Sequence, residues 1–374
     1  MSGLHVLTAA YPEVTTTDRA LLTRPSAVPE HAFVLSTCLR HDVVFAGGDD
    51  EVAAVVDRVT GGTPIRGVRL LSDLDAAQYV FRVAAGLESP IVGEREIWTQ
   101  FRKALADTKA TGAVPGLLVR LLDQAVATGR LARDLLPARP HDSMGAVAAQ
   151  MVGHLDHVAV FGSGEMARAV VDSLQMLPSP PTIVVAARRP ETVAMEGVET
   201  VSFDTARRLL ADHPAVISAT SAKTRLVPAD EVRVILAGRP DDLVLVDMAM
   251  PPDFDPGDAP HVTYVDIDDL ARMASRRPRP TSADDAVRDA ADDAYRRYRS
   301  HHDAAPVITD LVARADRIVD DVVARFGNRS GDEAVLRQAV HTAARRLIAD
   351  PLAFANAADA DERSVLAEAF RLDG

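Results

Sequence analysis

Between residues 151 and 275, short apolar runs alternate with amphipathic segments of helical periodicity, and this alternation restricts the fold more than any other feature. The runs are continuously apolar and rich in valine and isoleucine, as expected of strands that are buried on both faces. Strands that alternate with helices form a parallel, doubly wound sheet. The predicted strands are His157–Phe161, Thr182–Ala187, Ala215–Ala219, Leu243–Met248 and Val262–Val265.

The first of these strands leads directly into the glycine-rich turn Gly162-Ser163-Gly164-Glu165-Met166-Ala167 and then into an amphipathic helix. In such a turn the first glycine permits a sharp bend and the second lets a pyrophosphate approach the backbone. The small third residue allows helix and strand to pack closely. A purely structural glycine turn is the alternative, but the strand before and the helix after it favour a dinucleotide site.

Polar residues follow the next two predicted strands. Arg188 and Arg189 stand where an NAD site places an acidic residue. A guanidinium suits a 2′-phosphate, so we expect NADPH, with two merely exposed arginines as the alternative. Thr220 could contact the ribose or the nicotinamide, and an ordinary loop at a strand end explains it equally well.

Two further regions flank this nucleotide domain. Residues 1–150 mix short apolar strands with helical segments, which predicts an α+β domain. Residues 282–374 carry an apolar stripe at helical spacing and predict a helical domain, in which Pro306 should kink or break a long helix. We therefore expect a three-domain chain of mixed α/β and α class, divided at 1–150, 151–275 and 282–374.

The composition limits the expected cellular location of the protein and the kinds of site that it can contain. The chain has no signal-peptide pattern and no apolar stretch of about 20 residues, so we expect a cytoplasmic protein without a membrane span. The single cysteine excludes internal disulfides and cysteine-rich metal sites, and no metal is predicted. With a net charge of −13, the chain could grip a nucleic acid only through local basic patches. The candidate runs are Arg276, Arg277 and Arg279, then Arg296, Arg297 and Arg299, unless both are solvated surface runs.

The single cysteine, Cys38, follows an apolar strand and precedes polar and cationic residues. A thiol attacks carbonyl groups as the thiolate, and a nearby positive charge lowers its pKa. Arg40 and protonated His41 could provide that charge, whereas an inert buried cysteine is the alternative.

A second polar segment runs from Gly86 to Gln100. Glycine inside a helix costs about 1 kcal/mol against alanine, so its two glycines indicate a turn that carries polar groups into a pocket. Ser89, Glu94 and Gln100 are the candidate substrate ligands, and a surface helix–turn–helix is the alternative.

These segments together resemble the glutamyl-tRNA reductase family over nearly the full chain. The resemblance is carried by Ser36–Arg40, Arg82–Ser89, Gly93-Glu94, Gly162–Met166, Ile217–Thr220, Asp266–Leu270 and Arg346–Pro351. It implies a catalytic domain, an NADPH domain and a helical dimerisation domain with a long spine helix.

The resemblance also implies an activity. Cys38 would attack the ester of an aminoacyl-tRNA, and hydride from NADPH would reduce the thioester to an aldehyde. With glutamyl-tRNA the product is glutamate-1-semialdehyde, an intermediate toward tetrapyrroles such as haem. Arg40 would pair with the glutamate carboxylate, and the other expected substrate-binding residues are Thr37, Ser89, Glu94, Glu96 and Gln100. The expected partners are aminoacyl-tRNA, a second copy of the chain bound through the C-terminal helices, and a downstream aminomutase or aminotransferase.

Several pocket positions depart from the family pattern. Where the family has asparagine, this chain has Leu39, and where the family has glutamine, it has Glu96. Tyr79 occupies the position of a family histidine that lies near the thiol. Asp42 replaces a glutamate and Leu136 replaces a threonine of the family pattern. Tyr79 is the second candidate catalytic residue beside Cys38, because it can donate a hydrogen bond, but it cannot act as a base at neutral pH. Two alternatives therefore stay open: a reductase of another aminoacyl-tRNA or carrier-bound acyl group in specialised metabolism, and a non-catalytic regulatory homologue that binds tRNA or a partner.

Overall fold

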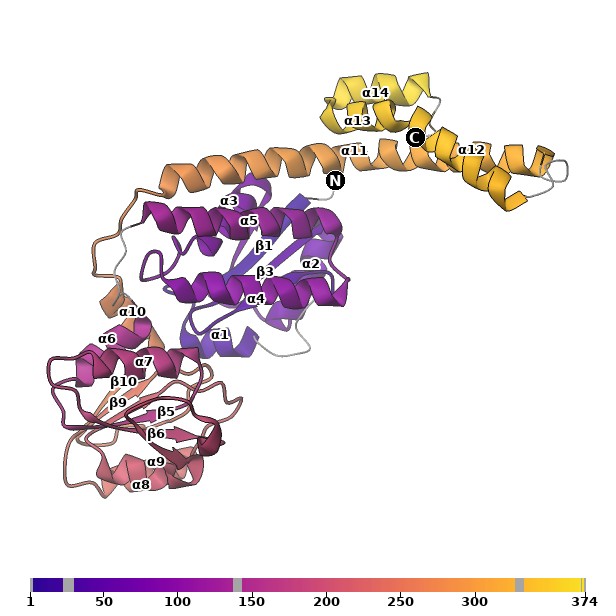
Figure 1. The fold of residues 1–374 in the computed structure, drawn as a ribbon. Helices are drawn as coiled ribbons and strands as arrows, with labels where there is room; N and C mark the ends of the chain where they lie inside the picture. Colours follow the sequence, from indigo (N-terminus) through magenta and orange to yellow (C-terminus); the bar gives the residue numbers. More distant parts are fainter. Residues whose placement is uncertain (1–2, 23–29, 137–142, 327–332, 371, 373–374) are drawn as a thin grey trace. The chain divides into compact units, whose positions relative to one another are not determined.

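The computed structural model describes residues 3–22, 30–136, 143–326, 333–370 and 372. The chain divides into two compact units, residues 1–291 and 292–374. The first unit contains two sheets with their helices, and the second contains only helices (Figure 1).

The first sheet is antiparallel and lies in the N-terminal part of the first unit. Its order is β2-β3-β1-β4, so that β2 is an edge strand. The strands are β1 (Gly3–Ala10), β2 (Phe33–Ser36), β3 (Arg40–Gly47) and β4 (Arg69–Ser72). The helices around it are α1 (Thr16–Leu22), α2 (Asp49–Thr60), α3 (Asp73–Ala84), α4 (Arg95–Thr111) and α5 (Gly116–Leu135).

The second sheet is parallel throughout, with the order β10-β9-β8-β5-β6-β7. Its strands are β5 (His157–Phe161), β6 (Thr182–Ala187), β7 (Glu199–Ser202), β8 (Ala215–Ser218), β9 (Leu243–Asp247) and β10 (Val262–Asp266). Its helices are α6 (Met144–Val152), α7 (Glu165–Gln175), α8 (Ala206–Asp212), α9 (Ala229–Ala237) and α10 (Ile267–Ala274). The sequence did not predict the short edge strand β7, whose residues are mostly polar.

Both faces of the parallel sheet are covered, which explains why its strands are continuously apolar. Along β5, Val158 and Val160 belong to one buried cluster, whereas Ala159 and Phe161 belong to another. Successive side chains of a strand point to opposite faces, so the two clusters lie on the two sides of the sheet. The predicted doubly wound sheet is confirmed.

The C-terminal helices are α11 (Asp284–Phe326), α12 (Glu333–Leu347), α13 (Ala349–Ala357) and α14 (Ala360–Ala369). The helical domain with a long helix is confirmed, but the predicted break at Pro306 is wrong, because α11 continues through it. An internal proline costs about 3 kcal/mol. Helical turns on both sides of Pro306, and the burial of Ala304 and Leu311, offset that cost.

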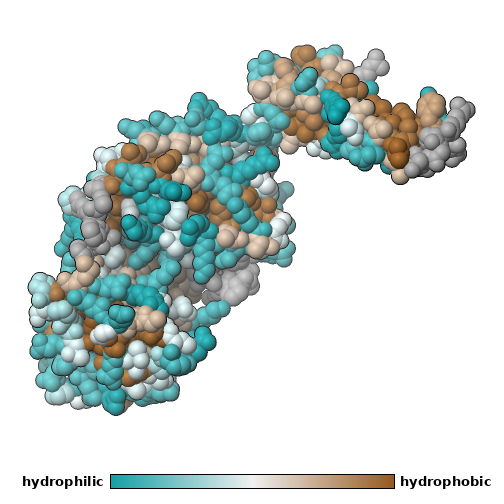
Figure 2. Space-filling view, viewed as in Figure 1, coloured by the Kyte–Doolittle hydropathy of each residue, from teal (hydrophilic) through white to brown (hydrophobic). Residues whose placement is uncertain are grey.

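The C-terminal unit exposes many apolar side chains, which show as brown patches over its helices in Figure 2. The largest of them are Ile318, Val335, Leu347, Phe354 and Val365, with exposed fractions between 46% and 80%. Patches of exposed apolar surface are typical of an association surface. Among the described residues, no helix has the length and apolar character needed to cross a membrane.

Candidate functional site

Cys38 lies in the tight turn between β2 and β3. The antiparallel pairing of these strands ends at Ser36 and His41, and the Thr37 amide donates a hydrogen bond to the Arg40 carbonyl (2.8 Å). The Thr37 hydroxyl oxygen accepts hydrogen bonds from the amides of Leu39 and Arg40, both at 3.2 Å. Thr37 therefore holds the turn that presents the thiol.

Arg19, which belongs to none of the motifs recognised in the sequence, anchors the same turn. Its side chain is fully buried, and its Nε–H donates to the Cys38 carbonyl at 3.2 Å. One NH2 group of its guanidinium pairs with the Asp268 carboxylate at 2.5 Å and donates to the Thr16 hydroxyl at 3.0 Å. Asp268 belongs to one of the family-like segments, but nothing local to Arg19 in the sequence indicates this role.

The Cys38 side chain lines a small cavity of about 20 Å³, which has room for about one water molecule. The β2–β3 turn, the segment before α4, the first turns of α4, α6 and the first turn of α7 all contribute to it. The lining residues are Thr37, Cys38, Leu39, Arg40, Ser89, Pro90, Glu94, Glu96, Ile97, Gln100, Met144 and Met166. Every predicted substrate-binding residue thus lies at one cavity with the thiol, and Met166 brings the glycine-rich turn to the same place.

The electrostatics of the thiol differ from the expectation. Burial, and then the nearby carboxyl groups of Glu94 and Glu96, raise the pKa of Cys38 to about 12, and Arg19 opposes this only in part. The expected lowering by Arg40 and His41 is wrong for two reasons. The Arg40 guanidinium is paired with Asp42 (3.4 Å), and burial lowers the pKa of His41, so that this ring is uncharged at neutral pH.

Glu94 and Glu96 are the two acidic residues that line the thiol cavity. Burial, and then the Glu96 charge, raises the pKa of Glu94 to about 8. Burial, and then the Glu165 charge from the start of α7, raises the pKa of Glu96 to about 7. One carboxyl oxygen of Glu94 is buried without a hydrogen-bond partner among the described residues. These groups exchange protons near neutral pH, a property of acid–base groups.

Tyr79 lies outside the thiol cavity, in a buried polar cluster with Arg40. Its hydroxyl donates to the Asp42 carboxylate (3.1 Å), lies 2.7 Å from the Thr8 hydroxyl and accepts from Arg40 (3.1 Å). The other Arg40 NH2 group donates to the Glu88 carbonyl. Tyr79 is therefore in a position to orient Arg40 and does not line the cavity that contains the Cys38 thiol.

Arg40 also borders a second, larger cavity of about 300 Å³. Arg69 and Arg279 contribute two more guanidinium groups to it, and Tyr79 and Ser89 contribute polar atoms. Because Arg40 and Ser89 line both cavities, a group with a carboxylate could extend from the thiol toward these arginines.

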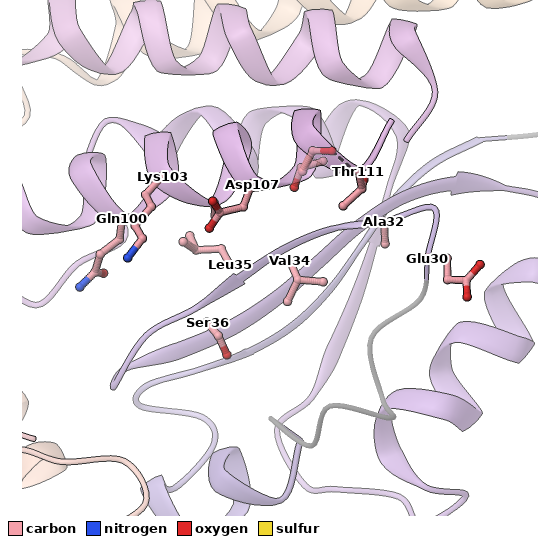
Figure 3. Close-up of a pocket in the computed structure, with 11 residues that line it drawn as sticks. Glu30, Ala32, Val34, Leu35, Ser36, Gln100, Lys103, Asp107 and Thr111 are labelled. Carbon is pink, nitrogen blue, oxygen red and sulfur yellow. Dashed lines mark hydrogen bonds between the residues drawn. The ribbon is translucent and has the colours of Figure 1, made fainter. Parts of the chain in front are cut away.

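A groove of about 570 Å³ lies between the edge strand β2 and α4 (Figure 3). Gln100, Lys103 and Asp107 project from α4 toward β2 in this view. Gln100 also lines the thiol cavity, so this residue connects the two spaces.

The glycine-rich turn has the geometry expected for a dinucleotide site. Gly162 has φ 118°, and a Cβ there would lie 2.5 Å from the Ala219 carbonyl oxygen. Gly164 precedes the first residue of α7 and has nothing within 4 Å of a Cβ position, and Ala167 is fully buried. Gly162, Gly164 and Ala167 thus meet the three requirements of the turn. Ser163 and Glu165 lie at the same helix N-terminus, which favours phosphates.

The other predicted cofactor residues lie at the carboxyl edge of the same sheet. Arg188 and Arg189 are exposed directly after β6. Thr220 follows β8, but its hydroxyl donates to the Asp253 carboxylate (2.8 Å) and accepts from the Ala222 amide (3.1 Å). Thr220 is therefore bonded within the protein, and its predicted contact with a cofactor stays a prediction.

Comparison with family models divides the chain into three matches. Residues 7–135 match the glutamyl-tRNA(Glu) reductase N-terminal domain, and residues 282–372 match the dimerisation domain of the same enzyme. Residues 146–273 match a family described as shikimate / quinate 5-dehydrogenase.

Proteins that are similar to most of the chain are named glutamyl-tRNA reductases. The chain is 30% identical to the glutamyl-tRNA reductase of Salinispora tropica over 364 residues, which cover 88% of this chain and 80% of the relative. It is 31% identical to that of Kineococcus radiotolerans, with 88% and 79% covered. The solved glutamyl-tRNA reductase from Methanopyrus kandleri aligns over 98% of both chains at 24% identity, with a TM-score of 0.49.

Proposed function

Because this chain belongs to the glutamyl-tRNA reductase family, we propose that it reduces glutamyl-tRNA to glutamate-1-semialdehyde with NADPH, through a thioester on Cys38. This product would enter tetrapyrrole synthesis. One observation carries the proposal: Cys38 lines a cavity together with Met166, which belongs to the first turn after the glycine-rich loop. A thiol and a dinucleotide turn at one cavity are what a two-step reduction of an ester requires.

The chain's own residues would perform the acyl-transfer step. The Cys38 sulfur attacks the ester carbonyl, the C–S bond forms, and the bond to the tRNA ribose oxygen breaks as that oxygen takes a proton. Glu94 and Glu96 line the same cavity and titrate near neutral pH, so they are suited to accept the thiol proton and to return it. Thr37 holds the turn so that the thiol faces the cavity.

The residues present fit a dinucleotide. The open approach to Gly164 and the N-terminus of α7 would hold the pyrophosphate, and Arg188 and Arg189 would hold the 2′-phosphate. When bound, NADPH supplies the hydride that converts the thioester to the aldehyde. The released sulfur takes up a proton and restores the Cys38 thiol.

Arg40 is the proposed ligand of the substrate's side-chain carboxylate, because it borders both cavities. Its guanidinium, however, already contacts Asp42, Tyr79 and the Glu88 carbonyl. This observation favours a second candidate, a reductase of the same mechanism that accepts a different aminoacyl-tRNA or carrier-bound acyl group. In both cases we propose a homodimer formed through the exposed apolar side chains of the C-terminal helices.

Trapping the acyl-enzyme tests the proposal. The protein is incubated with each of a panel of aminoacyl-tRNAs while NADPH is withheld, and its intact mass is measured. We expect a mass increase equal to glutamate minus water, its absence in Cys38→Ser, and release of the aldehyde when NADPH is added. An adduct with another amino acid supports the second candidate. No adduct with any acyl-tRNA, or equal turnover by Cys38→Ser, rules out both.

The choice of cofactor has its own test. Replacing Arg188 and Arg189 together by glutamine should weaken NADPH binding about tenfold or more and leave NADH binding unchanged, because only NADPH carries the 2′-phosphate. If the variant loses affinity for NADPH and NADH equally, the proposed binding of the 2′-phosphate by Arg188 and Arg189 is contradicted.

A further inference from the structure

Helices α4 and α5 pack side by side, and four of their five arginines are Arg95 and Arg102 on α4 and Arg130 and Arg133 on α5. We refer to these as the α4–α5 arginine cluster. The Trp98 ring lies within it, with the guanidinium carbons of Arg102 and Arg133 at 4.7 Å and 3.9 Å from its centroid. The Trp98 indole N–H donates to the Val126 carbonyl (3.0 Å), which fixes the ring. The cluster is therefore built on a rigid aromatic support.

The four arginines of the cluster place their positive charges close to one another. Burial, and then Arg95, Arg130 and Arg102, lower the pKa of Arg133, and the adjacent Asp134 opposes this in part. Within the described part of the chain, none of the four arginines forms an ion pair. By contrast, Lys109 farther along α4 is paired with Asp123 of α5 at 2.6 Å.

The arginine runs that the sequence suggested as nucleic-acid contacts are mostly engaged elsewhere. Arg279 donates to the carbonyls of Leu87 (2.7 Å) and Ser89 (3.2 Å). Arg296 is paired with Asp293, and Arg299 lies 3.5 Å from Asp303. Repulsion among the like charges of the α4–α5 arginine cluster costs free energy. In this protein of net charge −13, a bound anionic ligand would relieve that repulsion.

We propose that the α4–α5 arginine cluster binds phosphates of the acceptor end of the tRNA substrate. Three observations favour RNA. All four cations are arginines, whose planar fork matches phosphate oxygens. Three of them, Arg95, Arg102 and Arg130, are exposed on two helices rather than enclosed in a cavity, which suits a chain of phosphates more than a single one. Finally, α4 also supplies Glu96, Ile97 and Gln100 to the thiol cavity, where the ester of the same tRNA must arrive.

This inference rests on the proposed function, because the ligand is the tRNA of that reaction. It is tested with uncharged tRNA(Glu) transcript, whose binding does not depend on ester chemistry. The test variant is Arg102→Gln/Arg130→Gln. The matched control is Arg58→Gln/Arg66→Gln, which removes two exposed arginines from the same α+β region.

In the test variant we expect the dissociation constant for tRNA to rise about tenfold at 0.1 M salt. The slope of log K against log salt concentration should also become shallower by about 1.5, since each lost phosphate contact accounts for roughly 0.7–0.9. The control should keep the wild-type affinity and slope. Melting temperature and Cys38 alkylation should be the same in all three proteins.

Equal tRNA affinity and salt slope in the test and control variants overturn the inference, and so does a wild-type protein that binds no tRNA. Loss of binding to anionic lipid vesicles without loss of tRNA binding would assign the cluster to a membrane surface instead. A wild-type protein that binds tRNA through the cluster but forms no acyl-enzyme contradicts the proposed function and leaves the tRNA surface standing.

Discussion

The Arg19 guanidinium donates a hydrogen bond to the backbone carbonyl of Cys38, so a fully buried charge from α1 holds the turn that carries the thiol. The same guanidinium is paired with Asp268 at the start of α10. A residue remote in sequence from every predicted motif thus sets the position of the candidate nucleophile.

Replacing Arg19 by methionine should destabilise the fold by about 3–5 kcal/mol, because Asp268 and the carbonyls of Cys38 and Val14 would lose their partner. The measurement is chemical unfolding at pH 7. The control is Arg207→Met, which breaks the exposed pair with Glu231 and should leave the free energy of unfolding nearly unchanged. Equal losses in the two variants would contradict an anchoring role for Arg19.

The Cys38 thiol should react slowly with alkylating agents when no substrate is bound. With its pKa raised to about 12, the thiolate fraction at pH 8 is on the order of a thousandfold below that of free cysteine. Iodoacetamide labelling followed by intact mass measures the rate. Glu96→Gln removes a negative charge beside the thiol and should accelerate labelling at pH 8, whereas Glu51→Gln on the exposed face of α2 should not.

The raised pKa of Glu96 makes stability depend on pH in a defined direction. The folded protein holds this proton up to about pH 7, whereas the unfolded chain releases it near pH 4.5, so stability falls as pH rises between these values. Glu96→Gln should therefore stabilise the protein at pH 8 by on the order of 1–3 kcal/mol and have little effect near pH 4.5. The measurement is the melting temperature of wild type and Glu96→Gln at pH 8 and at pH 4.5. If Glu96→Gln is less stable than wild type at pH 8, the raised pKa of Glu96 is contradicted.

The two glycines of the nucleotide turn should behave differently when each is replaced by alanine. Gly162→Ala should destabilise the fold by about 2–3 kcal/mol, because its Cβ would meet the Ala219 carbonyl and its φ is positive. Gly164→Ala should leave the melting temperature nearly unchanged, since nothing lies within 4 Å, yet weaken NADPH binding about tenfold or more. Normal cofactor affinity in Gly164→Ala would exclude close approach of the pyrophosphate.

The parallel sheet could be predicted because its evidence is local: each strand is a continuous apolar run, and Gly162 and Gly164 have single-residue reasons to be glycine. The edge strand β7 was missed because its polar residues carry no apolar signal. The position of Arg19 and the partners of Tyr79 depend on contacts between segments far apart in the chain, which no local pattern encodes.

The charge state of the Cys38 thiol also depends on contacts between distant segments, which the local sequence does not reveal. Arg40 and His41 follow Cys38 closely in sequence, and they suggested a lowered pKa for its thiol. In the folded protein Arg40 turns to Asp42 and Tyr79, while Glu94 and Glu96 from a distant segment face the thiol. Neighbours in sequence were a poor guide to neighbours in space.

The small volume around Cys38 bears on the fate of an aminoacyl-tRNA once it has reacted. A thioester in water is open to hydrolysis, which would return the free amino acid and waste the energy used to charge the tRNA. A cavity of about 20 Å³ leaves room for about one water molecule beside the sulfur. In the proposed reaction this limited space for water beside the sulfur would slow hydrolysis of the acyl-enzyme while it waits for reduction.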